Sequence, residues 1–157
     1  MQFPLRPEVP EKKIILEISP LMSADCAAFD ASDRVLLVRR EDNGLWALPG
    51  GVVEVGERPA DAAVREAFEE VGLRAEAVAL NGQYDSRSTG TNTPFHVVHL
   101  VYACRVTDAS ALRVSAETDD FGWFSRDRVP RLSPGHDVRV RDAFDRHEGK
   151  LTRQSFC

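Results

Sequence analysis

The stretch from Arg58 to Val71 restricts the fold most strongly, because it predicts an amphipathic helix whose two ends are both marked. Pro59 suits the first helical position, since its missing N–H would have no helical partner there. Alanines and acidic residues follow, and Gly72 is placed to end the helix. Arg58 is a poor N-cap residue. The chain must therefore provide a surface on which this helix can pack.

Three carboxylates share one narrow face of the predicted helix. At 100° per residue, Glu66, Glu69 and Glu70 lie on the same side of the helical wheel. Five apolar residues cluster around the opposite side, namely Ala60, Val64, Ala67, Phe68 and Val71. We expect the helix to pack on a sheet through these apolar residues and to turn its glutamates outward.

Glutamates on a helix usually form a solvent-exposed charged face, but two electrostatic costs count against that interpretation here. Glu66 and Glu70 are like charges one helical turn apart, which costs roughly 0.2 to 0.5 kcal/mol. Glu69 and Glu70 lie in the last turn, where the helix dipole disfavours anions by roughly 0.3 to 1 kcal/mol. Arg65 can offset part of this by pairing with Glu69 or Glu57. The clustered carboxylates therefore favour a divalent cation, which prefers oxygen ligands.

A glycine-rich break precedes the helix. Pro49, Gly50 and Gly51 separate two short apolar runs, so the backbone here can approach a ligand closely. Carbonyl oxygens of this segment can add to the ligands of a cation held by the helix.

The rest of the sequence alternates short β-compatible runs with one further helix. Strands are expected at Ile14–Ile18, Ala24–Phe29, Arg34–Arg40, Ala75–Tyr84, Phe95–Val106 and Phe121–Phe124, and a second helix at Pro134–His147. Asp30 to Asp33 form a turn that makes a hairpin of the strands on either side. The polar segment Asp85 to Thr93 is a loop. The order predicts an α/β layered domain with a mixed sheet.

Composition and charge exclude several classes of function. Twenty Lys and Arg against 25 Asp and Glu give a net charge of −5, so no stable nucleic-acid binding is expected. The longest apolar run, Val97 to Cys104, is too short for a membrane span. The first dozen residues lack the apolar core of a secretory signal, so we expect a cytoplasmic protein. Cys26, Cys104 and Cys157 follow no metal-binding or disulfide spacing and are expected to be reduced.

The segment Gly51 to Leu73, GVVEVGERPADAAVREAFEEVGL, resembles the Nudix box, the signature of hydrolases that act on nucleoside diphosphates linked to another moiety. One departure is Ala67, where the family usually places a larger aliphatic residue. The resemblance extends over about residues 14–148, with 1–13 as an extended N-terminal arm and 149–157 as a C-terminal tail. It implies an α/β/α sandwich with a mixed central sheet, and hydrolysis by water at a phosphorus atom that depends on Mg²⁺ or Mn²⁺.

The resemblance also implies roles for individual residues. Glu66, Glu69 and Glu70 would hold the metal, with the carbonyl of Gly51 as a further ligand. Glu57 and Arg65 would form a supporting ion pair that orients loop and helix. The general base remains open between Glu66 and Glu117, because family members take it either from the box or from a distant loop.

Substrate specificity lies outside the box. Candidate substrate-binding residues are Arg39, Phe95 and His96, each of which also has an ordinary structural reading on a strand. The segments around Pro94 and Glu117 resemble the subgroup that contains CDP-choline pyrophosphatase and related nucleoside-diphosphate pyrophosphatases, with a nucleotide-type substrate and a homodimer as one assembly. Two alternatives stay open: a nucleoside triphosphate pyrophosphohydrolase that removes damaged nucleotides, and a non-catalytic nucleotide-binding domain. The second usually loses box acids, all of which are present here.

Overall fold

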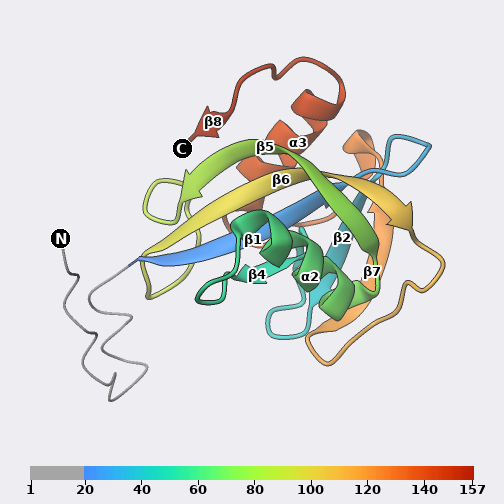
Figure 1. Ribbon diagram of the computed structural model, residues 1–157, viewed down its shortest axis with the longest axis horizontal. Helices are drawn as coiled ribbons and strands as arrows, with labels where there is room; N and C mark the ends of the chain where they lie inside the picture. Colours follow the sequence, from blue (N-terminus) through green and yellow to red (C-terminus); the bar gives the residue numbers. More distant parts are fainter. Residues whose placement is uncertain (1–19) are drawn as a thin grey trace.

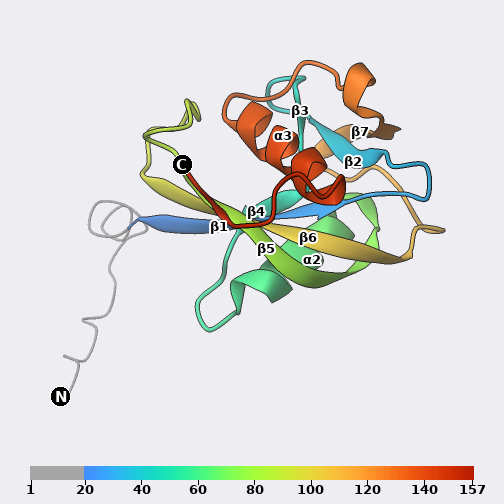
Figure 2. The same ribbon diagram turned by 90° about the horizontal axis from the view of Figure 1, so that it is seen from above.

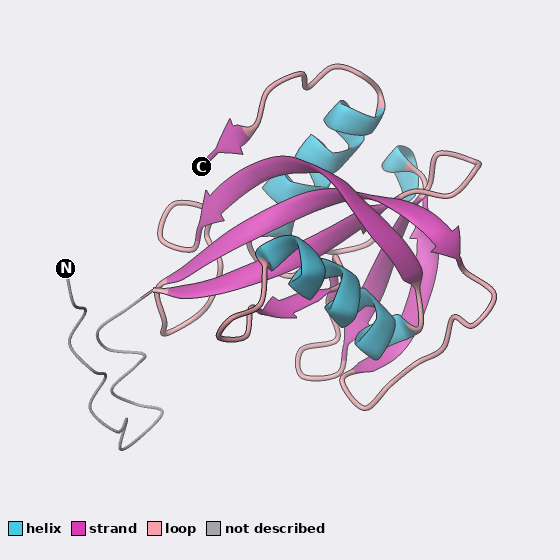
Figure 3. Cartoon of the chain, in the orientation of Figure 1, coloured by secondary structure: helices cyan, strands magenta, loops and turns pink. Residues whose placement is uncertain are grey.

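The computed structural model describes residues 20–157, so the predicted arm 1–13 and the predicted strand Ile14–Ile18 lie outside the described residues. The elements are β1 (Leu21–Ala28), β2 (Val35–Arg40), β3 (Trp46–Ala47), β4 (Gly50–Val52), α2 (Pro59–Val71), β5 (Arg74–Asp85), β6 (Val97–Asp108), β7 (Thr118–Phe124), the 3-10 turn η1 (Arg126–Arg128), α3 (His136–His147) and β8 (Ser155–Phe156). Figure 3 shows how strands dominate the chain. Within residues 20–157, no helix combines the length and apolar character needed to cross a membrane.

Two sheets lie between the two helices. The larger sheet has the order β4-β1-β6-β5-β8 and the smaller one β3-β2-β7 (Figure 1). β1 pairs in parallel with β6 and antiparallel with β4, so the large sheet is mixed. Viewed from above, α2 covers one face of this sheet, and α3 lies on the other face together with β2 and β7 (Figure 2). The α/β sandwich with a mixed sheet predicted from the sequence is confirmed.

Two apolar clusters flank the large sheet. Alternate residues of β1 face α2, and the intervening ones face α3. The α2 cluster includes Cys26 and Ala67, and the α3 cluster includes Tyr84 and Phe144. The three cysteines are free. Both faces of β1 are thus covered, which makes it the central support of the site described below.

The predicted hairpin of the first two described strands is wrong. β1 and β2 are joined by the expected turn, with one isolated bridge between Phe29 and Val35, but they belong to different sheets. Both edges of β1 are taken by β4 and β6, while β2 pairs with β3 and β7. With a partner on each edge, β1 has no edge left for β2.

The segment after α3 adds a strand to the large sheet. β8 pairs in parallel with β5 at Gly82 and Gln83. A Cβ at Gly82 would lie 2.7 Å from the backbone oxygen of Ser155, so this pairing requires glycine. Residues 149–157 therefore include part of the sheet edge as well as a connecting loop.

Candidate active site

The helix α2 begins and ends where the sequence predicts. Arg58 occupies the N-cap position without a side-chain hydrogen bond, and Pro59 follows at the first helical position. Gly72 ends the helix in the left-handed conformation with φ of 74°. The orientation of the helix differs from the prediction, because its fully buried residues are Ala62, Ala63, Ala67 and Val71.

The prediction that all three glutamates point outward is therefore wrong for two of them. The buried alanines lie on the wheel beside Glu66 and Glu70, so the acidic face meets the edge of the sheet instead of solvent. The side chain of Glu66 is 13% exposed, whereas that of Glu69 is 56% exposed. Small alanine side chains allow this close approach of helix and sheet. Phe68, on the opposite side, is only partly buried beneath the guanidinium groups of Arg74 and Arg113.

Arg65 gathers the acidic residues around it. Its Nε and Nη2 donate to the two carboxylate oxygens of Glu57 at 2.7 and 3.0 Å, which is the predicted ion pair. Its Nη1 donates to Glu66 and to Glu69, each at 3.0 Å. The hydrogen bond from Arg65 lowers the pKa of Glu57 and ensures that this carboxyl is charged at neutral pH. Glu57 also accepts the backbone N–H of Glu54, so one ion pair joins the loop to the helix.

The two glutamates nearest the sheet have raised pKa values. Burial raises the pKa of Glu66, and the nearby charges of Glu69 and Glu117 add to the effect, against the lowering effect of Arg65. Burial, followed by the charge of Glu66, raises the pKa of Glu70 to about 8, although the N–H of Gly50 donates to its carboxylate. These groups repel one another in a partly desolvated place, so a cation between them would be favoured.

The carboxylate of Glu66 lies against Gly51. A Cβ at Gly51 would lie 2.5 Å from the carboxyl carbon of Glu66, so any other residue there would displace this carboxylate. The Gly51 backbone and the Glu66 carboxylate are therefore in direct contact, as a shared cation site requires. Among residues 20–157, however, no three His, Cys, Asp or Glu side chains already converge at ligand distance. In this structure Arg65 occupies the carboxylate oxygens of Glu66 and Glu69 instead.

Glu117 lies close enough to affect the box acids. Its charge raises the pKa values of both Glu66 and Glu70. The neighbouring Thr118 hydroxyl donates to the backbone oxygen of Glu70 at 2.9 Å, which fixes the end of α2 against the start of β7. The structure thus brings the distant loop acid to the helix.

Two residues near this cluster are not among the predicted site residues: Arg40, where Arg39 was predicted to face the substrate, and Asp25. A hydrogen bond to Asp42 raises the pKa of Arg40, and the charges of Glu70 and Asp25 add to it, so Arg40 faces the acids. Asp25 is fully buried on β1 and also raises the pKa of Glu70. An acid inside an otherwise apolar strand was a signal in the sequence for Asp25.

The three predicted substrate-binding residues have other close contacts. Arg39 pairs with Asp119 at 2.6 Å, on β7. His96 pairs with Asp85 at 2.9 Å and precedes β6, which begins two residues later than predicted. Phe95 is 41% exposed beside it. All three remain on the surface, but the structure does not unite them with the glutamates.

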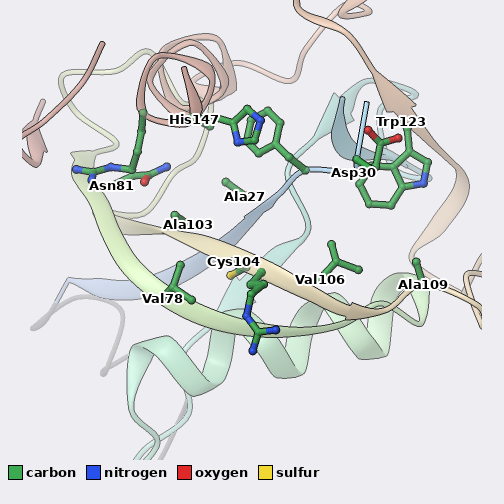
Figure 4. Close-up of a pocket in the computed structure, with 15 residues that line it drawn as sticks. Ala27, Asp30, Val78, Asn81, Ala103, Cys104, Val106, Ala109, Trp123 and His147 are labelled. Atoms are coloured by element: carbon green, nitrogen blue, oxygen red, sulfur yellow. The ribbon is translucent and has the colours of Figure 1, made fainter. Parts of the chain in front are cut away.

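A cavity of about 560 Å³ lies elsewhere, between the C-terminal half of α3 and strands β5 and β6. Figure 4 shows Ala27, Ala103 and Cys104 along its floor, with His147 above them and Trp123 at one end. Its lining contains none of the predicted site residues. The cavity and the glutamates of α2 are therefore separate places in the molecule.

Known proteins resemble this chain in sequence and in fold. The family model of the NUDIX domain matches residues 20–144. A MutT-like protein of Streptomyces ambofaciens is 36% identical over 125 residues, covering 74% of this chain and 77% of its own. An ADP-ribose pyrophosphatase of Methanocaldococcus jannaschii is 31% identical over 134 residues, covering 83% and 77%. The crystal structure of an ADP-ribose pyrophosphatase from Streptococcus suis superposes with a TM-score of 0.72 at 28% identity, covering 88% of this chain and 98% of its own.

Proposed function

Because the chain belongs to the Nudix family and is a Nudix hydrolase, we propose that it hydrolyses the diphosphate linkage of a nucleoside diphosphate joined to another moiety. Water attacks a phosphorus atom of the diphosphate, and the reaction depends on Mg²⁺ or Mn²⁺. The observation that carries the proposal is the contact between Gly51 and the Glu66 carboxylate, beside the buried carboxylate of Glu70.

The residues present fit a divalent cation. The Gly51 carbonyl, Glu66, Glu69 and Glu70 would hold it, since all offer the oxygen atoms that Mg²⁺ and Mn²⁺ prefer. A cation would also relieve the repulsion that raises the pKa values of Glu66 and Glu70. When bound, it neutralises diphosphate charge and lowers the pKa of water.

The protein's own residues would position and deprotonate the attacking water. Glu57 holds Arg65 through two hydrogen bonds, and Arg65 keeps Glu66 directed toward the glycine segment. The base is Glu66 or Glu117, both of which lie at the acidic cluster. Arg40, which pairs with Asp42 and lies near the charge of Glu70, would contact a phosphate group of the substrate.

ADP-ribose is the first substrate to test, because the similar proteins from Methanocaldococcus jannaschii and Streptococcus suis are both named ADP-ribose pyrophosphatases. The Arg39, Phe95 and His96 side chains are proposed to contact the moiety beyond the phosphates. CDP-choline belongs in the same panel because of the segments around Pro94 and Glu117.

The test is a panel of nucleoside diphosphate conjugates and nucleoside triphosphates, each incubated with Mg²⁺, with Mn²⁺ or with EDTA, with the products separated by chromatography. We expect ADP-ribose to give AMP and ribose 5-phosphate only when metal is present. Release of pyrophosphate from triphosphates alone would replace the proposal with the triphosphate reaction. Equal turnover in EDTA would contradict the metal site.

The base is assigned by comparing Glu117→Gln with Glu66→Gln. Loss of a general base typically lowers turnover by about 10² to 10⁴-fold. Because Glu66 is also a proposed ligand, the informative variant is Glu117→Gln. An unchanged rate removes Glu117 from the mechanism and leaves Glu66 as the base.

A further inference from the structure

Gly50 and Gly51 are each backed by a carboxylate, and the two carboxylates come from opposite faces of the sheet. In the register of β1 and β4, Gly51 lies opposite Ala24 and Gly50 opposite Asp25. A Cβ at Gly51 would meet Glu66 on the α2 side, and a Cβ at Gly50 would overlap the carboxylate of Asp25 on the α3 side. The missing side chains of β4 are thus replaced by acids from both directions.

The acid on the α3 side is held by a buried arginine. Arg139 Nη1 donates to Asp25 Oδ2 at 2.9 Å, and the two side chains are 1% and 4% exposed. Nη2 of the same guanidinium donates to Thr91 at 3.0 Å. Arg139 therefore joins α3 to β1 inside the molecule.

A second contact links α3 to the same segment. His136 Nδ1 lies 3.3 Å from the backbone N–H of Leu48, two residues before Gly50, and its Nε2 lies 3.3 Å from Arg139 Nη1. Burial and the charge of Arg139 lower the pKa of His136, so its ring is neutral and accepts one of these two hydrogen bonds at a time. In either state His136 fills the space between Arg139 and the segment that leads into β4.

Stability alone does not explain such a pair. Removing two charges from water is costly, and apolar residues of similar volume often stabilise a protein as well or better. Asp25 instead lies opposite Gly50 in the register, with its carboxylate against that glycine, and the backbone N–H of Gly50 lowers the pKa of Glu70. The Asp25–Arg139 pair thus contacts Gly50, the neighbour of the proposed metal ligand Gly51.

We propose that Arg139 is a positioning residue for the metal site, which through Asp25 fixes the Gly50–Gly51 backbone against Glu66 and Glu70. The proposal rests on the proposed function, since it concerns the cation held by these groups. Partners that orient metal ligands from behind typically change metal affinity by about 10 to 100-fold when removed.

The experiment measures Mn²⁺ affinity from the electron paramagnetic resonance signal of free Mn²⁺, in the absence of substrate. The variant combines Asp25→Asn with Arg139→Met, which removes both charges and leaves neither one unpaired. The matched control combines Asp145→Asn with Arg126→Met, because Arg126 and Asp145 form an exposed pair at 2.6 Å that does not contact β4. Thermal unfolding in EDTA shows that each variant is folded.

We expect the Asp25 and Arg139 variant to bind Mn²⁺ about tenfold more weakly or worse, with a lower kcat and an unchanged KM. The control should keep the wild-type affinity. Should the double variant not fold, Arg139→Lys carries the same expectation, because it keeps a positive charge beside Asp25 and loses the guanidinium that contacts Asp25 and Thr91 together. Wild-type Mn²⁺ affinity in a folded variant overturns the positioning role.

The wild type and Glu70→Gln separate this proposal from the proposed function. If the wild type binds Mn²⁺ and Glu70→Gln does not, the metal site stands, and the double variant decides the role of Arg139 by itself. If the wild type does not bind Mn²⁺, the metal site fails and the positioning role fails with it.

Discussion

Two arginine–carboxylate pairs flank β4, and they differ in how far water reaches them. Arg65 is 25% exposed and divides its hydrogen bonds among Glu57, Glu66, Glu69 and a backbone carbonyl. Arg139 is 1% exposed, and its one carboxylate partner among the described residues is Asp25. Water reaches the first pair, so its contacts can rearrange, whereas those of the buried pair cannot do so without leaving a charge unpaired. Under the proposed function, the open pair would exchange contacts with a cation and a substrate, and the buried pair would hold the backbone beside them.

The largest expected effect is the loss of stability when the buried pair is broken. Arg139→Met leaves the carboxylate of Asp25 without its charged partner, and losing one member of a buried pair costs about 3 to 5 kcal/mol. Urea unfolding in EDTA measures the loss in the free energy of unfolding. Arg126→Met, at an exposed pair, should lose about 0 to 1 kcal/mol. Equal losses in the two variants would remove the distinction between the pairs.

The next largest effect is expected on the open face, where a substitution of Glu70 should lower activity without lowering stability. Glu70→Gln should lower turnover by about 100-fold or more, above the range for residues that only orient ligands. In EDTA the variant should be within about 1 kcal/mol of the wild type or more stable, because repulsion from Glu66 and the helix dipole is relieved. Initial rates with Mg²⁺ and thermal unfolding in EDTA test both parts. A much less stable variant, or one with nearly full activity, would make Glu70 a structural residue.

The α3 side of the sheet, where Arg139 lies, should also lose more stability as the pH falls. Burial, and then the charge of Arg139, lowers the pKa of His99 to about 3. The unfolded chain takes up this proton near pH 6.5 and the folded one near pH 3, so the contribution to stability is present above pH 6.5 and lost as the pH falls. Between pH 6.5 and 4.5 we expect a loss on the order of 1 to 3 kcal/mol that His99→Gln reduces. Parallel pH profiles of unfolding for both proteins would contradict this.

The smallest effect on stability is expected for Glu69, the most exposed of the three helix glutamates. Glu69→Gln removes the negative charge that pairs with Arg65, a loss of about 0.3 to 0.5 kcal/mol, and relieves a similar dipole penalty in the last turn. The free energy of unfolding in EDTA should therefore change by less than about 0.5 kcal/mol. A loss as large as that of Arg139→Met would show that Arg65 and its partners are as tightly coupled as the buried pair.

Much of the open site could be predicted because it lies within one continuous segment. Helical periodicity placed Glu66, Glu69 and Glu70 together, and the ion pair of Glu57 with Arg65 spans only eight residues. The direction of the acidic face was wrong, because periodicity gives relative angles within the helix and cannot say which side meets the sheet. The buried side includes Ala62 and Ala63, and alanine occurs on both buried and exposed faces of helices, so the pattern could not reveal this orientation.

The buried pair could not be predicted, since Asp25 and Arg139 are 114 residues apart in the sequence. The sequence by itself determined the family, the helix with its ends and the set of acids, all of which depend on local spacing. The tertiary structure alone decided that β1 leaves its hairpin partner, that Glu117 and Arg40 reach the acids, and that α3 contacts β4 through Asp25. These contacts arise when the sandwich closes, because burying both faces of β1 brings distant segments together and forces each buried charge to find a partner.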